Sequence, residues 1–357
     1  MPGARWAQAT NGKRPEVSRP TWILALLLAI AALLAALAVR SRGRTADVVV
    51  LKLAHGLDTA HPVHQAMVFL AERAAQKSDG KLVIQIFPSE QLGSERVLIE
   101  QTQMGLIDMT KSSAAALEQF VPELAVFGMP YLFRDSEHYW ATLDGAIGRE
   151  LLAAGAERGL IGLCYFDAGS RSFYTKNRPI RSPDDLAGLK IRVQESNTAK
   201  RMVEQLGGSP TSMAWGELYT ALQQGVVDGA ENNPPSFLSS RHCEVCKYYS
   251  LDEHTQVPDM LVISRWTWQR LSPRHRRILQ EAADEASQYQ RRLWARKTAE
   301  ALEQARRAGV EIIHPDKGPF VECVGPMLQA EAGSPVGRWI ERIRAGAVGL
   351  ADRPDRE

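Results

Sequence analysis

Two arginines stand out as residues whose type and surroundings suit the binding of an organic anion. Arg192 lies in the short, partly apolar run 190–193, and Arg171 follows the apolar run 160–166 on an expected turn. The planar guanidinium offers five N–H donors and can hold a carboxylate through two parallel hydrogen bonds. Because ligands of open α/β sheets bind at strand ends, the position of Arg171 favours such a role. For Arg192 two interpretations stay open, an anion-binding group that faces a cleft or a solvated charge at the sheet edge.

The same search finds binding groups but no signature of catalysis. Asn232 and Asn233 precede two prolines that restrict the backbone, so their amides either serve a site or form a plain turn. The sequence has no Gly-x-Ser-x-Gly elbow, no His-Glu-x-x-His motif, no glycine-rich phosphate loop and no dinucleotide fingerprint. We therefore expect a binding protein, not an enzyme, without a cofactor.

Cys243 and Cys246 have the spacing of a redox motif or of half a zinc site. A zinc site needs a second pair of ligands, and neither His242 nor His254 supplies a recognised spacing. We therefore expect no metal site and place both thiols on a helix or turn. A disulfide between them in an oxidising compartment stays open.

The charges are unevenly distributed along the chain. Of 43 Lys and Arg and 41 Asp and Glu, seven basic residues and one acidic residue lie in the first 44 positions. The rest of the 357-residue chain therefore carries 36 basic and 40 acidic residues, a net charge of −4. Such a body has no general attraction for polyanions, so we expect no nucleic-acid partner.

The basic N-terminus flanks an unbroken apolar run over residues 22–39. The small residues Ala36 and Ala38 fit the cleavage site of an export signal. A helix of this length would also reach about 27 Å, close to the bilayer core, so an uncleaved anchor is the alternative. In either case we expect the rest of the chain to be exported to the periplasm.

The chain then predicts an α/β fold. Residues 48–53 form a β-branched and apolar run, 61–77 has apolar residues at helical spacing, and 82–87 alternates as a second strand. A strand, a helix and a strand within about 40 residues predict a βαβ unit and hence a parallel sheet.

One segment recurs and predicts two lobes of similar build. Gln103–Asp108 (QMGLID) returns as Gln223–Asp228 (QQGVVD), each after a helical stretch, 95–103 and 217–224. In both copies the glycine lies where a helix C-cap is expected. The two apolar residues after it are expected to begin a short strand.

The C-terminal third predicts a long helix and then a tail. Residues 272–308 are rich in helix-forming residues and would give a helix of roughly 50 Å, long enough to lie across both lobes. Residues 336–357 are rich in Gly, Arg, Asp and Pro, and we expect a flexible tail there.

Over about residues 49–330 the chain resembles the solute-binding receptors of TRAP transporters, of the dicarboxylate-binding (DctP) type. Several long runs carry this resemblance in the correct order. They are Phe87–Gly93 (FPSEQLG), Asp185–Val193 (DLAGLKIRV), Trp215–Gly225 (WGELYTALQQG), Val227–Asn232 (VDGAEN) and, more weakly, His314–Pro315.

The resemblance implies a two-lobed periplasmic binding protein (Venus flytrap) that closes on one ligand, backed by a long helix spanning both lobes. The implied parts are a signal peptide or anchor (1–48), lobe I (49–170 with 258–280), lobe II (171–257 with 281–335) and the tail (336–357). It also implies that small and large membrane subunits of the transporter are the partners.

The resemblance assigns roles to seven residues of this chain. In the second lobe, Arg192 pairs with the ligand carboxylate, Arg171 assists, Asn232 braces the carboxylate and Trp215 covers the ligand. In the first lobe, Glu95, Ser113 and His55 meet the hydroxyl-bearing end.

The runs 170–176 and 231–237 look like the sugar-acid-binding branch of the family, which favours a uronate or related hexonate. Glu95 suits that ligand, because its carboxylate would accept hydrogen bonds from hydroxyls and repel a second ligand carboxylate. A C4-dicarboxylate is the alternative ligand. Alternative classes are a membrane-anchored ligand sensor, for which the ~21 residues before Trp22 leave no room for an output domain, and, more remotely, a lyase.

Overall fold

The computed structural model of the protein describes residues 26, 28–33 and 48–351. Residues 1–48 and 49–357 form separate units, and the fold below is that of the second unit. Residues 26 and 28–33 are helical, and the rest of the predicted export segment 22–39 lies outside the described residues. No helix within the described ranges is long and apolar enough to cross a membrane.

The first of two sheets has five strands in the order β2-β1-β3-β10-β4. Its strands are β1 (Val49–Ala54), β2 (Leu82–Phe87), β3 (Met109–Ser113), β4 (Leu160–Phe166) and β10 (Asp259–Ser264). β1 pairs in parallel with β2 and β3, and helix α2 (Pro62–Lys77) connects β1 to β2, as predicted. Helix α2 buries Val63, Met67 and Leu70, the apolar positions that predicted it.

The second sheet has six strands in the order β11-β9-β5-β8-β6-β7. They are β5 (Arg171–Thr175), β6 (Lys190–Val193), β7 (Ser209–Ser212), β8 (Gly229–Asn232), β9 (Tyr248–Thr255) and β11 (Glu311–Ile313). We call the parts of the molecule built on the two sheets the first and the second lobe. The residue boundaries predicted for the lobes stay a prediction.

The chain crosses from one sheet to the other three times, between β4 and β5, between β9 and β10, and between β10 and β11. Each sheet thus has a strand at which the chain leaves it and a strand at which the chain returns. In the first sheet β10 is antiparallel to β3 and β4, and in the second β5 is antiparallel to β8 and β9.

Helix α12 (Pro273–Arg307) confirms the predicted long helix and spans both lobes. Ile278, Ala282 and Trp294 join the apolar core beside the first sheet. Near its end Ala305 joins a core of the second sheet, together with Tyr249. The helix therefore belongs to both cores.

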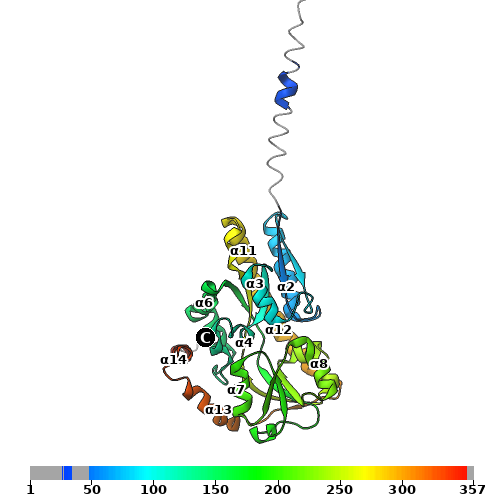
Figure 1. Ribbon diagram of the computed structural model, residues 1–357, viewed down its shortest axis with the longest axis vertical. Coiled ribbons are helices and arrows are strands. Elements are labelled where there is room, and N and C mark those ends of the chain that lie inside the picture. The colour runs from blue at the N-terminus through cyan, green and yellow to red at the C-terminus, as the bar shows by residue number, and fades with distance from the viewer. Residues whose placement is uncertain (1–25, 27, 34–47, 352–357) are drawn as a thin grey trace, which may run out of the picture. The chain divides into compact units, whose positions relative to one another are not determined.

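The other helices pack around the two sheets (Figure 1). They are α3 (Glu95–Met104), α4 (Ala114–Leu117), α5 (Ser136–Asp144), α6 (Ala146–Ala153), α7 (Asn197–Gln205), α8 (Trp215–Gln224), α9 (Pro234–Ser239), α10 (His242–Val245), α11 (Arg265–Arg270), α13 (Gly318–Ala330) and α14 (Pro335–Ala351). Short 3-10 helices are η1 (Pro122–Gly128), η2 (Ala156–Arg158) and η3 (Pro183–Leu186).

The recurring helix–glycine segment is present in both lobes. Gly105 ends α3 and Gly225 ends α8, each in the left-handed conformation with φ of 74°. The prediction that the next two residues begin a strand is wrong, since β3 and β8 start four residues after the glycines. The intervening turn is held instead by an aspartate. Asp108 accepts the backbone N–H of Lys52 at 2.8 Å, and Asp228 accepts that of Lys190 at 2.8 Å.

The structure also corrects the expected tail. Residues 335–351, most of the segment predicted as flexible, form helix α14 (orange to red in Figure 1). Ile340 and Ile343 are buried in the core formed by η1 and α5, where Leu124 and Tyr139 also lie. The apolar spacing of these isoleucines outweighs the Gly- and Arg-rich composition of the segment.

Candidate ligand-binding site

A cavity lies between the two lobes, and its empty space of about 540 Å³ is partly open to solvent. Of the seven predicted site residues, six line it: Arg192, Arg171, Asn232, Trp215, Glu95 and Ser113. Residues from both lobes therefore meet at one place, as the strand ends of two facing sheets would.

Arg192 carries a buried charge that no acidic side chain in the described part of the chain pairs with directly. The residue is 2% exposed on β6, an inner strand of the sheet, so it is not a solvated edge charge. Nε and Nη2 both donate to the backbone oxygen of Met213, at 3.1 and 2.8 Å. Nη1 has no hydrogen-bond partner among the described residues. Burial lowers the pKa of the guanidinium, as expected where the charged form lacks a counter-ion.

Arg171, in contrast, is already neutralised by the protein. Its Nε and Nη2 donate to the Glu231 carboxylate, the latter at 2.8 Å, and Nη1 donates to Asn232 Oδ1 at 2.9 Å. Burial opposes ionisation of Glu231, but Arg171 and His254 outweigh it and lower the pKa of that carboxyl to about 2. Asn232 Oδ1 also accepts the N–H of Asn233 at 2.9 Å, so its amide nitrogen is the group left to donate.

Trp215 is the first residue of α8 and forms part of the cavity wall beside Arg192. The Arg192 guanidinium carbon lies 5.7 Å from the centroid of the Trp215 ring, within reach of a cation–π contact. The indole therefore offers an apolar face next to the guanidinium.

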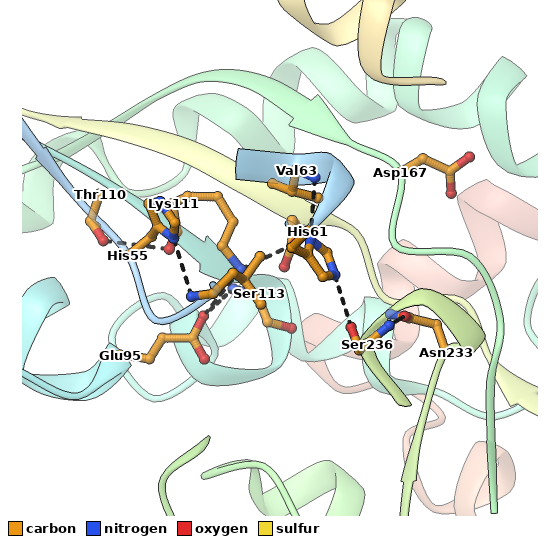
Figure 2. A network of polar contacts seen from close by, with 12 residues as sticks. His55, His61, Val63, Glu95, Thr110, Lys111, Ser113, Asp167, Asn233 and Ser236 are labelled. Carbon is orange, nitrogen blue, oxygen red and sulfur yellow. Dashed lines mark hydrogen bonds and ion pairs between the residues drawn. The ribbon is translucent and has the colours of Figure 1, made fainter. Parts of the chain in front are cut away.

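The first lobe supplies Glu95 and Ser113, from α3 and β3. Glu95 Oε1 accepts the backbone N–H of Ser113 at 2.7 Å, and Ser113 Oγ lies 3.3 Å from Gln194 Oε1 of the second lobe. Burial raises the pKa of the Glu95 carboxyl, and the nearby charge of Lys111 opposes this shift. Figure 2 shows Glu95, Ser113 and Lys111 close together.

His55 does not line the cavity, contrary to the prediction. It is fully buried in the first lobe, where Nδ1 accepts the N–H of Leu57 at 3.1 Å and Nε2 lies 3.1 Å from His64 Nδ1. Burial, and then the charge of Lys111, lower the pKa of His55 to about 2. Its ring is thus a neutral part of the core at the end of β1.

Lys111 and Asp259 are the site residues that the sequence prediction missed. Both line the cavity, and Lys111 Nζ donates to Asp259 Oδ2 at 3.1 Å and lies 3.9 Å from Glu95 Oε1. Glu90 and Gln194 also line it. A signal for Lys111 existed: it follows Gly105 by six positions, as Glu231 follows Gly225 in the matching copy of the repeat.

Contacts across the cavity connect the two lobes directly. His61 Nε2 lies 3.1 Å from Ser236 Oγ, as Figure 2 shows, and Gly216 N–H donates to Glu90 Oε1 at 3.3 Å. Behind the cavity, Glu118 accepts Ser196 Oγ–H at 2.9 Å. The two walls of the site are therefore in contact with each other.

Among the described residues, no group of three or more His, Cys, Asp or Glu is arranged to hold a metal ion. Cys243 and Cys246 are both buried free thiols, Cys243 on α10 and Cys246 just after it. The cavity is thus a polar site with an unmatched guanidinium, suited to an organic anion.

Comparison with known proteins gives a consistent result. The model of the family described as bacterial extracellular solute-binding protein, family 7 (DctP), matches residues 53–333. A protein of Salmonella typhimurium, YiiZ, is 38% identical over 310 residues, 86% of this chain and 93% of its own length. The C4-dicarboxylate-binding periplasmic protein DctP of Rhodobacter capsulatus is 30% identical over 293 residues, 82% of this chain and 87% of its own.

Solved structures of TRAP periplasmic solute-binding proteins are similar in fold and sequence. One from Xanthobacter autotrophicus, with bound β-D-galacturonate, has a TM-score of 0.80 at 38% identity and covers 83% of this chain and 99% of its own. One from Anaerococcus prevotii, with bound D-glucuronate, has a TM-score of 0.81 at 39% identity and covers 83% of this chain and 97% of its own.

Proposed function

Because this chain belongs to family 7 of the bacterial extracellular solute-binding proteins, we propose that it is a TRAP receptor for a uronate. It captures the sugar acid between its lobes and delivers it to the small and large membrane subunits of the transporter. The receptor acts in the periplasm, either released from its N-terminal segment or anchored by residues 22–39. The family consists of solute-binding proteins.

The observation that carries this proposal is the Nη1 group of Arg192. A buried guanidinium N–H without a partner is costly unless a ligand satisfies it. A carboxylate placed there accepts a charge-assisted hydrogen bond and supplies the missing counter-charge. Asn232 and Arg171 brace the same carboxylate from β8 and β5, and Trp215 covers the ligand.

The charges that line the cavity limit the ligand to one carboxylate. Arg171 is matched by Glu231 and Lys111 by Asp259. The other charged residues of the lining are Arg192, Glu90 and Glu95. One anionic group at Arg192 is favourable, but a second one opposite would meet carboxylates. Hydroxyl groups fit that side, because Glu95 and Ser113 can accept and donate hydrogen bonds.

The ligands of the two solved relatives, galacturonate and glucuronate, have this composition of one carboxylate and several hydroxyls. A C4-dicarboxylate is the second candidate, since the Rhodobacter capsulatus relative is named for that ligand class. Its second carboxylate would lie near Glu95 and Glu90, which is the physical reason for ranking it second.

A thermal-shift screen of the purified protein tests the proposal, followed by calorimetry. Glucuronate or galacturonate at 100 times the dissociation constant should stabilise the protein by about 2.7 kcal/mol. Succinate and malate should give a much smaller shift at equal concentration. If succinate binds tightly and uronates do not bind, the dicarboxylate candidate replaces the uronate.

A further inference from the structure

The repeated helix–glycine–strand segment continues further than its sequence similarity. Lys111 on β3 and Glu231 on β8 each lie six residues after the capping glycine, and they are 5% and 2% exposed. Two residues later, Ser113 and Asn233 are the N-caps of α4 and α9. A lysine in one lobe thus occupies the position of a glutamate in the other.

Each of these buried charges pairs with the first residue of an antiparallel neighbouring strand. Lys111 pairs with Asp259 at the start of β10, and Glu231 pairs with Arg171 at the start of β5. The two lobes therefore present equivalent ion pairs of opposite polarity to one cavity. At the repeated position the second lobe has the anion, Glu231, and the first lobe has the cation, Lys111.

The two pairs differ in how many hydrogen bonds the protein makes to Glu231 and to Lys111. Both oxygens of Glu231 accept hydrogen bonds from Arg171. The Lys111 ammonium has three N–H donors, and among the described residues it makes one hydrogen bond, to Asp259. Glu95, at 3.9 Å, is too distant for a second one. Donor capacity of Lys111 is therefore left at the cavity wall.

Building on the proposed uronate receptor, we propose that Lys111, between Glu95 and Asp259, binds neighbouring ring hydroxyls of the ligand and determines its class. A ligand hydroxyl can accept a hydrogen bond from the Lys111 ammonium and donate its own hydrogen to one of the two carboxylates beside it. Glu95, Lys111 and Asp259 thus offer an acceptor, a donor and an acceptor, which match two adjacent hydroxyls. A ligand carboxylate at this place can only accept and would meet two carboxylates. Lys111 is thus a specificity-determining residue in the wall opposite Arg192.

The test compares galacturonate with a set of monodeoxy galacturonates, each without one ring hydroxyl, on the full chain by calorimetry. In the unmodified protein, loss of the hydroxyl at Lys111 should weaken binding roughly 10- to 100-fold, as for a hydrogen bond to a charged group. In Lys111→Met, which keeps the chain length without a donor, galacturonate should bind correspondingly less well. In this variant, removal of the same hydroxyl should weaken binding by no more than threefold relative to galacturonate.

Lys52→Met is the matched control, because Lys52 is an exposed lysine on the neighbouring strand β1, and it should leave every ratio unchanged. If Lys111→Met does not fold, Lys111→Gln, which keeps a donor for Asp259, must still lessen the loss on removing that hydroxyl, because its bond to the hydroxyl no longer involves a charge. Deoxy penalties that are equal in the unmodified protein and the variant at every position would overturn the inference and leave a structural ion pair. Absence of any uronate binding to the unmodified protein would overturn the proposed function as well, so the two failures differ.

Discussion

At the scale of single residues, two guanidiniums line one cavity but differ in what they still require. Arg171 bonds to Glu231 and Asn232, whereas Arg192 bonds to one backbone oxygen and keeps Nη1 without a partner among the described residues. A buried charge that the fold itself does not match is costly. We therefore expect the ligand to supply at Arg192 the negative charge that Glu231 supplies at Arg171.

Arg192→Lys should abolish tight binding while the protein stays folded. Lysine keeps the charge but not the planar fork, and loss of a buried partner of a carboxylate costs about 2–5 kcal/mol, roughly 30-fold to several-thousand-fold in affinity. Calorimetry with galacturonate measures the effect. Arg181→Lys, at an arginine whose side chain is 61% exposed, should bind as the unmodified protein does. Binding of Arg192→Lys within threefold of the unmodified protein would contradict the assignment.

Glu95→Gln should change affinity in opposite directions for two classes of ligand. Glutamine keeps one acceptor oxygen for the Ser113 N–H but loses the charge-assisted bond to a ligand hydroxyl, so uronate binding should weaken by about 1–3 kcal/mol. The same change removes a repulsion, so weak binding of succinate should improve. Glu100→Gln, later on the same helix, is the control. If neither ligand responded, Glu95 would serve only the start of α3.

Residue type and position favoured Arg171, which follows a predicted strand, but left Arg192 and Asn232 open, and the family resemblance assigned these two their roles. The first-lobe part was harder. Lys111 in isolation is typical of a solvent-facing strand position, and its partner Asp259 is 148 residues away in the sequence. Such a pair depends on which strands become neighbours, and that is a property of the sheet.

At the scale of elements, the recurring helix–glycine segment could be predicted, but the start of its strands could not. Ile107 and Val227 are buried, which the apolar pattern indicates correctly, yet Leu106 and Val226 are exposed. Hydrogen bonds from Lys52 and Lys190 to Asp108 and Asp228 hold these residues in a turn. Local apolar character therefore shows that a strand follows without fixing its first residue.

Gly105→Ala and Gly225→Ala should each destabilise the protein by about 1–2 kcal/mol. Both glycines have φ of 74°, where a Cβ is unfavourable. The nearest atoms to an added Cβ are at 3.4 and 3.6 Å, so the cost is conformational and not a clash. Denaturant unfolding measures it. Gly346→Ala, inside helix α14 with no described atom outside its own helix backbone within 4 Å of an added Cβ, should instead stabilise by roughly 0.5–1 kcal/mol. Neutral effects at both capping glycines would contradict this account.

At the scale of the whole molecule, the two sheets are joined by crossing segments and by one long helix. This arrangement suits a protein whose lobes close towards each other around a ligand. Ser113 and Gln194, and Glu90 and Gly216, bridge the cavity between the lobes. The two-lobed α/β class and α12 could be predicted from sequence periodicity. The bridging pairs could not, since they join residues that are 81 and 126 positions apart.

Ligand binding should therefore make the protein more compact. Small-angle scattering should give a smaller radius of gyration with saturating galacturonate than without it, because closure brings the lobes together. Arg192→Lys at the same ligand concentration should keep the ligand-free radius. An unchanged radius of the unmodified protein at saturation would argue against hinge closure.

Acid should weaken ligand binding through His61, which joins the lobes. His61 Nδ1 accepts the N–H of Val63 at 3.2 Å, so the neutral ring carries its proton on Nε2 and donates it to Ser236 of α9. Burial, and then the charges of Lys111 and His64, lower the pKa of His61 to about 3. Trp294 of α12 packs against the ring, with the ring centroids 5.8 Å apart.

The sign of the effect follows from linkage. With the lobes apart, water reaches His61 and its pKa returns towards about 6.5, whereas the closed form keeps the ring neutral. Closure is then fully favourable above about pH 6.5 and loses about a factor of ten per pH unit below it. Between pH 7.5 and 5.5 the affinity for galacturonate should fall about tenfold. In His61→Gln, which keeps a donor for Ser236 but does not titrate, the fall should disappear. In His314→Gln, at an exposed histidine, it should remain. Calorimetry at both pH values decides the matter, because parallel pH profiles of His61→Gln and the unmodified protein would assign the titration to another group.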